Sequence, residues 1–118
     1  MIDKIISRLK TGRIKNVVPY GYGENAAPPY IIVREEQDSL GRGIVYRIIG
    51  HMLPGQIIFL EEYMRNDIST LLDNYVITSR NGNVNELMTE QYNSGTIANN
   101  DDGTISRERR FLLPSIVF

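Results

Sequence analysis

The chain contains no cysteine in its 118 residues. That absence excludes disulfides, thiolate zinc sites and thiol nucleophiles, so the fold must be stabilised by packing or by association with other subunits. The sequence also has no run near the roughly 18 apolar residues that a membrane helix needs, and its first residues lack the apolar run of a secretory signal. A chain of this length can bury one modest core, so we expect a single domain over residues 1–118 and no membrane partner.

Histidine is almost absent too, because His51 is the only one. A catalytic histidine needs a nucleophile to activate, a carboxylate to orient it or other metal ligands, and the surrounding sequence GHMLPGQ signals none of them. A lone histidine also rules out the usual histidine-rich zinc sites. We therefore expect His51 to pack or cap where a strand passes into a helix, and we expect no catalytic residue, no bound metal and no other cofactor.

Glycine-rich and acidic stretches do not change this expectation. A phosphate-binding glycine loop lies between a strand and a helix, whereas the sequence GRG at residues 41–43 precedes a predicted strand. Adjacent side chains on a strand point to opposite faces, so the paired carboxylates at residues 35–36 do not converge. The sequence NNDDG at residues 99–103 resembles a calcium loop but lacks its closing glutamate, and we interpret it as a turn.

The formal net charge of −1 is unevenly spread, because residues 1–23 carry +4 and the remainder about −5. A basic arm of this size could touch phosphate. A dedicated nucleic-acid binder, however, carries its basic patch over the whole domain. The charge distribution therefore disfavours specific recognition of DNA or RNA.

Local hydrophobic patterns predict a short helix followed by a hairpin. Apolar residues at helical spacing indicate an amphipathic helix over residues 2–10, ended by Gly12. Two alternating, β-branched stretches at residues 30–36 and 44–51 are separated by a polar segment with two glycines, which is typical of a β-hairpin. Each face of the first stretch begins apolar and ends charged, so we expect the turn of the hairpin to project from the core.

A long helix is predicted between Pro54 and Asn74, since proline suits the first helical turn and apolar residues then recur at three- and four-residue steps. Its predicted inward face consists of Ile57, Leu60, Met64, Ile68, Leu71 and Tyr75. Asn-Gly at residues 81–82 and Asp-Gly at residues 102–103 indicate further strands joined by tight turns. The predicted fold class is α+β: a single domain with a mostly antiparallel β-sheet, a short N-terminal helix and one long helix packed on one face.

The C-terminal sequence SRERRFLLPSIVF joins dense positive charge to an apolar end. On a strand, Arg107 and Arg109 share one face with Phe111, while Glu108 and Arg110 share the other. The apolar residues would be costly in water, by roughly 1.5 to 3 kcal/mol each, so we expect them to be covered. A charged segment beside an apolar one is typical of a subunit contact, and a strand edge guarded by charge is the alternative.

After the short N-terminal helix, the stretches PPYIIVREEQDSLGRGIVYRIIGH, PGQIIFLEEYMRNDISTLLDNY and DGTISRERRFLLPSIVF resemble the tail terminator, or tail completion, proteins of long-tailed bacteriophages. The resemblance covers nearly the whole chain and is carried by element order, length and hydrophobic pattern, without an invariant motif. It implies a structural virion protein and not an enzyme. Such a protein forms a homo-oligomeric ring, usually a hexamer, that caps the tail tube, stops its polymerisation and provides the head-docking interface.

The resemblance also implies partners and a location. The partners would be other copies of the chain, the tail tube protein and the head-completion or connector protein, with DNA passing through the ring without sequence-specific binding. The ring would belong to the tail or neck of the virion, after assembly in the host cytoplasm. Subunits would meet at residues 34–43 and 106–110, with Glu35 or Glu36 pairing with Arg107 or Arg109 of the next copy. The candidate interface residues are Arg34, Glu35, Glu36, Arg42, Arg107, Arg109, Arg110 and Phe118.

Two other interpretations stay open. The proline-rich sequence NAAPPY and the long segment 76–103 depart from the family pattern, which allows another phage neck or tail adaptor, such as a head-completion (stopper) protein or a minor tail protein. A small ligand-binding domain or enzyme is the second alternative, and its loops would have to close a pocket.

Overall fold

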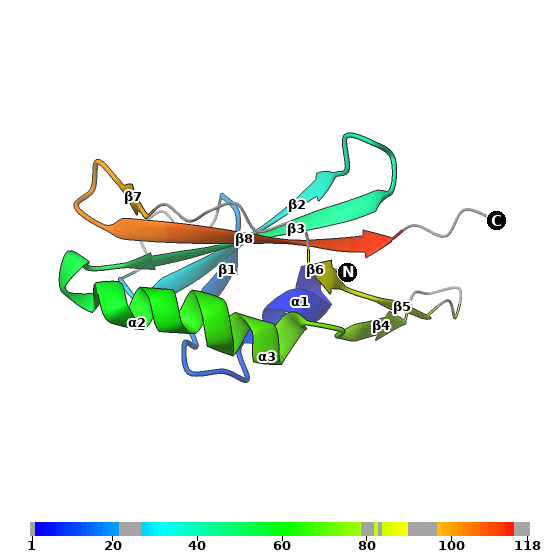
Figure 1. The fold of residues 1–118 in the computed structure, drawn as a ribbon, viewed down its shortest axis with the longest axis horizontal. Coiled ribbons are helices and arrows are strands. Elements are labelled where there is room, and N and C mark those ends of the chain that lie inside the picture. Colours follow the sequence, from blue (N-terminus) through cyan, green and yellow to red (C-terminus); the bar gives the residue numbers. More distant parts are fainter. Residues whose placement is uncertain (1, 22–26, 79–81, 83, 90–96, 115–118) are drawn as a thin grey trace.

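A computed structural model describes residues 2–21, 27–78, 82, 84–89 and 97–114 of the chain. Within these residues, helices cover one face of a sheet, and the second face carries no described helix (Figure 1). The elements in chain order are α1 (Ile2–Leu9), β1 (Val17–Pro19), β2 (Tyr30–Gln37), β3 (Gly43–Met52), η1 (Pro54–Gln56), α2 (Ile57–Glu62), η2 (Tyr63–Asp67), α3 (Ile68–Leu72), β4 (Val76–Thr78), β5 (Val84–Glu86), β6 (Met88–Thr89), β7 (Ala98–Asn99) and β8 (Ile105–Pro114).

The main sheet has the strand order β1-β2-β3-β8-β6, and β7 also pairs with β8. Only β1 runs parallel to its neighbour; the described pairings of β2, β3, β6, β7 and β8 with one another are antiparallel. Strands β4 and β5 form a separate two-stranded hairpin that extends beyond the end of α3 (Figure 1). The predicted fold class is confirmed: one domain of mixed α and β structure with a short N-terminal helix, one long helix and a mostly antiparallel sheet.

The predicted hairpin is the pair β2–β3, whose register runs from Tyr30 opposite His51 to Gln37 opposite Ile44. Its turn projects from the sheet, as expected (Figure 1). Within the turn, the Arg42 guanidinium donates to both carboxylate oxygens of Asp38, at 2.8 and 3.0 Å. These bonds, with the Arg42 backbone N–H, lower the pKa of Asp38 to about 2. The side chain of Arg42 is therefore bound within its own turn.

The core lies between the helices and one face of the sheet. Alternate residues of β3 point into it, because successive side chains on a strand point to opposite faces. At Gly50 the long helix approaches the strand so closely that an added Cβ would lie 2.9 Å from the sulfur of Met64 and 3.2 Å from a methyl of Leu60. The fully buried side chains include Ile5, Leu9, Ile31, Val33, Tyr46, Ile48, Met52, Leu60, Tyr63, Met64, Ile68, Leu72 and Phe111.

The long helix is continuous from Pro54 to Leu72 but changes its winding in the middle. Residues Tyr63–Asp67 form a π-helical turn, in which the N–H of Ile68 donates to the carbonyl of Tyr63. A π-turn holds more residues than the 3.6 of an α-helical turn. Four buried side chains of the helix therefore follow four-residue steps, namely Leu60, Met64, Ile68 and Leu72, and Tyr63 is buried as well.

This winding corrects part of the predicted inward face. Ile57 was expected to face the core, but it is 44 % exposed. Leu71 and Tyr75 are half-buried at the margin, whereas Leu72 takes the central position. The helix ends as predicted, because Asn74 adopts a left-handed conformation with φ of 59°.

A buried arginine from β8 reaches the π-turn. The Arg109 guanidinium donates to the carbonyl of Met64 at 3.2 Å and to the hydroxyl of Ser69 at 2.7 Å, and it lies 5.0 Å from the ring centre of Phe111. In an α-helix the Met64 carbonyl would accept the N–H of Ile68, which here donates to Tyr63 instead. Arg109 thus supplies a charged donor to the Met64 carbonyl, because the backbone N–H that would bond it in an α-helix is bonded to Tyr63.

Removing this guanidinium should destabilise the fold. We expect Arg109→Ala to lower the free energy of unfolding by about 3 kcal/mol, because a charge-assisted bond is lost and a buried carbonyl loses its donor. The matched control is Arg110→Ala on the same strand, whose side chain is 50 % exposed and should cost under about 1 kcal/mol. Urea denaturation of both variants measures the difference, and equal losses would contradict this role of Arg109.

Candidate interaction surface on the open sheet face

The second face of the sheet is formed by the side chains of β2, β3 and β8 that point away from the helices. We call it the open face. It is defined by the strand register, which places alternate residues of the three strands in common rows. Its residues on these strands are Tyr30, Ile32, Arg34, Glu36, Val45, Arg47, Ile49, His51, Ser106, Glu108, Arg110 and Leu112.

Three arginines lie side by side across the open face. Arg34 of β2 is opposite Arg47 of β3, and Arg47 is opposite Arg110 of β8. Like charges directly opposite each other on a sheet are destabilising. A row of this kind persists only if other groups compensate the charge.

Two glutamates provide that compensation. Glu36 accepts from Arg34 at 2.8 Å and from Arg47 at 3.0 Å. Glu108 lies between Arg47 and Arg110, at 2.6 and 2.9 Å from their nitrogen atoms. The hydrogen bond from Arg47 is the main reason that the pKa of Glu36 lies below its ordinary value. The result is a continuous network, which we call the arginine row, with three positive and two negative charges.

The arginine row is half-buried at its centre and exposed at its ends. The side chains of Arg47 and Glu108 are 24 and 22 % exposed, whereas that of Arg110 is 50 % exposed. At the other end, the Arg34 guanidinium lies 4.4 Å from the ring centre of Tyr20. The network therefore keeps a net positive charge and accessible arginines at both margins.

Apolar side chains flank the arginine row on both sides. Ile32 and Ile49 are paired across β2 and β3 on one side. On the other side, Val45 pairs with Leu112, which is buried, and Leu112 pairs with Met88 of β6, which is 55 % exposed. Arginine within an apolar surround is the composition that protein interfaces favour.

The structure brings together three of the sequence-predicted site residues, Arg34, Glu36 and Arg110, in the arginine row. Arg107 and Arg109 share a face with Phe111 as predicted, but this is the helix-covered face, and each is only 6 % exposed. Burial of this extent leaves them little surface for a second subunit.

The remaining predicted residues lie elsewhere. Glu35 is exposed but points to the opposite face from Glu36. Arg42 is bound to Asp38 in the hairpin turn. Phe118 lies outside the described residues, whereas Phe111, Leu112 and Leu113 of the same apolar end are buried as expected.

Sequence reasoning missed Arg47 and Glu108 as site residues. A signal was available for Arg47, since pairing the two hairpin strands symmetrically about the turn places it opposite Arg34. Two arginines at one level of a hairpin require nearby carboxylates. Glu108 could be recognised as a partner of Arg47 only if the pairing of β3 with β8 were known, and these two strands are separated by more than fifty residues in the sequence.

His51 packs as expected, within the last two residues of β3. Its ring stacks on Tyr30, with ring centres 4.7 Å apart and planes 5° from parallel. Its Nδ1 is buried and has no hydrogen-bond partner among the described residues. Burial lowers the pKa of His51, and the carboxylate of Asp102 opposes this only in part. The histidine is therefore held in its neutral form.

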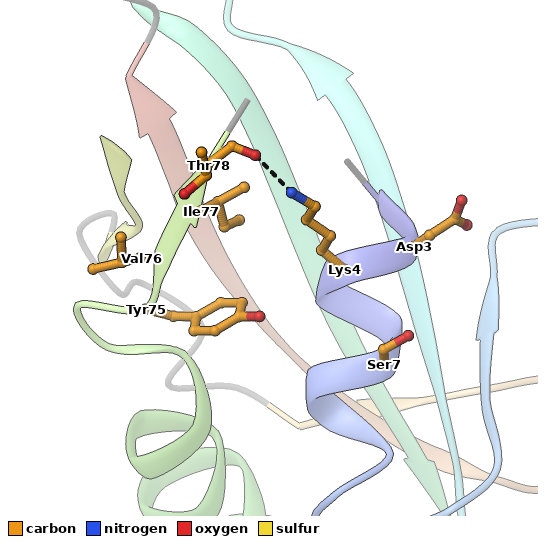
Figure 2. A pocket seen from close by; sticks show the side chains of 7 residues that line it. All are labelled: Asp3, Lys4, Ser7, Tyr75, Val76, Ile77 and Thr78. Atoms are coloured by element: carbon orange, nitrogen blue, oxygen red, sulfur yellow. Dashed lines mark hydrogen bonds between the residues drawn. The ribbon is translucent and has the colours of Figure 1, made fainter. Parts of the chain in front are cut away.

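Two open depressions lie away from the arginine row. Figure 2 shows the first, of about 440 Å³, between α1 and the start of β4. Its Lys4 donates to the backbone carbonyl of Thr78 at 2.6 Å, and Asp3 points away from the β4 side. The second, of about 540 Å³, contains Arg13, which is bound through two nitrogens to Asp67. In both, the charged side chains are held by the chain's own atoms or point outward.

The described part of the chain has no group of three or more histidine, aspartate or glutamate side chains placed to hold a metal ion. No helix in the described ranges is both long and apolar enough to span a membrane.

Comparisons with known proteins return no relative. No protein-family model matches the chain, and no curated protein or solved structure is significantly similar to it. The open face is therefore interpreted from its own chemistry.

The arginine row should respond to the loss of one carboxylate. We expect Glu108→Gln to destabilise the fold by about 1 kcal/mol, because the carboxylate between Arg47 and Arg110 is lost and only Glu36 still compensates their repulsion. Added salt should recover part of this loss, since repulsion is screened over about 10 Å at 0.1 M salt. Urea denaturation at low and high salt measures both effects. The exposed Glu61→Gln serves as control, and a Glu108 variant as stable as the control would contradict the compensation.

The buried histidine predicts a pH dependence. Because the pKa of His51 is lower in the folded chain than in the unfolded one, the unfolded chain takes up its proton first. The contribution of His51 to the free energy of unfolding is therefore fully present above the pKa of about 6.5 that histidine has in the unfolded chain. It decreases as the pH falls towards the lower pKa of His51 in the folded chain. His51→Phe keeps the stacking on Tyr30 and should remove the decrease between pH 7 and pH 5. Thermal denaturation across this range checks it, and an unchanged slope in the variant would exclude His51 as the cause.

Proposed function

We propose that the chain is a structural virion protein of a long-tailed bacteriophage: a ring-forming tail terminator that caps the tail tube, stops its polymerisation and docks the head. The observation that carries the proposal is the open face, a broad sheet surface with an arginine network in an apolar surround and no described helix on it. Arginine is enriched and apolar area is concentrated where protein surfaces meet. The chain thus offers a contact surface suited to assembly.

The charge distribution supports the same role. Two glutamates reduce the net charge of the arginine row to +1, which limits its attraction for a phosphodiester backbone. Residues 24–118 carry a negative balance, so the body of a ring built from this chain would let DNA pass without holding it. The partners in this proposal are other copies of the chain, the tail tube protein and the head connector, at the tail or neck of the virion.

Electron microscopy of phage particles that lack this chain tests the proposal. A missing terminator leaves tube polymerisation unchecked, so we expect overlong tails, restored to normal length when the wild-type chain is supplied from a plasmid. Tails of normal length on heads that have lost their DNA would indicate a head-completion protein instead. Intact particles with filled heads and normal tails would contradict any structural role at the neck.

A further inference from the structure

A second exposed surface lies on the outer side of the long helix, near its start. Three large apolar side chains gather there: Leu53, Ile57 and Ile58, which are 50, 44 and 77 % exposed. With Glu61, one helical turn further on, they form what we call the helix patch.

The helix patch has an acidic margin. Glu62 is held by the Arg13 guanidinium at 3.0 Å. Glu61 is exposed and has no ion pair among the described residues. Among the described side chains, the patch therefore combines apolar area with one unpaired negative charge, whereas the five charged side chains of the arginine row sum to a net charge of +1.

We infer that the helix patch of one copy docks on the open face of a second copy of this chain. In this contact Ile57 and Ile58 pack on Ile32 and Ile49, and Glu61 faces the arginine row. Both surfaces combine apolar side chains with charged ones, and their net charges are opposite in sign, which provides the complementarity that fixes partner and register. The inference rests on the proposed function, since it names the contact by which the ring is built.

The positions of the two surfaces determine the kind of assembly. The helix patch and the open face lie on opposite sides of the sheet (Figure 1). A contact between two different surfaces is heterologous, so every copy keeps one free surface of each kind until the assembly closes. The expected product is a closed ring and not an isolated two-fold dimer.

Two variants each remove one surface. Ile58→Asp places a charge in the helix patch, and Arg110→Glu reverses a charge at the exposed end of the arginine row. A third variant, Arg34→Ser, is a milder change at the other end of the arginine row. The matched controls are Leu40→Asp, at a turn residue that is 75 % exposed, and Lys10→Glu, at an exposed basic residue of the N-terminal segment. Circular dichroism confirms that each variant is folded before its assembly is measured.

Native mass spectrometry and light scattering then report the state of each sample. We expect wild-type chain and both controls to form rings, and each surface variant alone to associate at least about thirty-fold more weakly. An equimolar mixture of Ile58→Asp and Arg110→Glu should form a one-to-one heterodimer, because each partner contributes the surface that the other lacks. Such a heterodimer cannot grow further, since its two remaining surfaces are the altered ones.

The outcomes separate this contact from the proposed function. If wild-type chain forms rings and Ile58→Asp or both open-face variants form them equally well, the contact is overturned while the ring proposal stands. If the two surface variants are monomeric and their mixture is monomeric too, the contact is also overturned. A wild-type chain that stays monomeric up to millimolar concentration, with or without tail tubes, overturns both.

Discussion

The hydrogen bonds from the Arg109 guanidinium join the strand that carries part of the arginine row to the long helix that carries the helix patch. They connect the central strand β8 to the middle of the long helix, at the carbonyl of Met64 and the hydroxyl of Ser69. On the outer side, Arg13 binds Asp67 at the end of the same turn, so the turn is held from two directions. The wider winding of the helix at Tyr63–Asp67 is thereby held in place.

Strand β8 then determines the composition of the opposite face. Side chains alternate along a strand, so placing Arg107, Arg109 and Phe111 against the helices directs Glu108 and Arg110 away from them. Antiparallel pairing with β3 sets Arg110 beside Arg47, and the hairpin sets Arg47 beside Arg34. One strand thus carries a structural arginine on one face and an interaction arginine on the other.

Much of the fold could be predicted from sequence because local rules decide it. Periodicity placed the N-terminal helix and the β2–β3 hairpin, Pro54 marked the start of the long helix and Asn74 its end. The π-turn could not be predicted, since its Met64 carbonyl is bonded to Arg109, 45 residues away in the sequence. Ile57 was placed inward because of its three-residue spacing from Leu60, although it lies on the surface.

The candidate site was predicted less completely than the fold. Arg34, Glu36 and Arg110 were identified from charge density alone, without the pairing of strands that unites them. Arg47 and Glu108 complete the network only once β3 lies between β2 and β8. Burial likewise depends on the tertiary arrangement. Of the three arginines in SRERR, Arg107 and Arg109 are buried, whereas Arg110 is half exposed.

The absence of cysteine makes the central claim directly measurable, because an introduced thiol has no competitor in the chain. The measurement is cross-linking of assembled protein with a short bismaleimide, using Ile58→Cys and Ile49→Cys separately and mixed. A head-to-tail contact between the helix patch and the open face predicts cross-linked pairs in the mixture and none in either variant alone. Pairs formed by one variant alone, or rings that yield no pairs in the mixture, would contradict it.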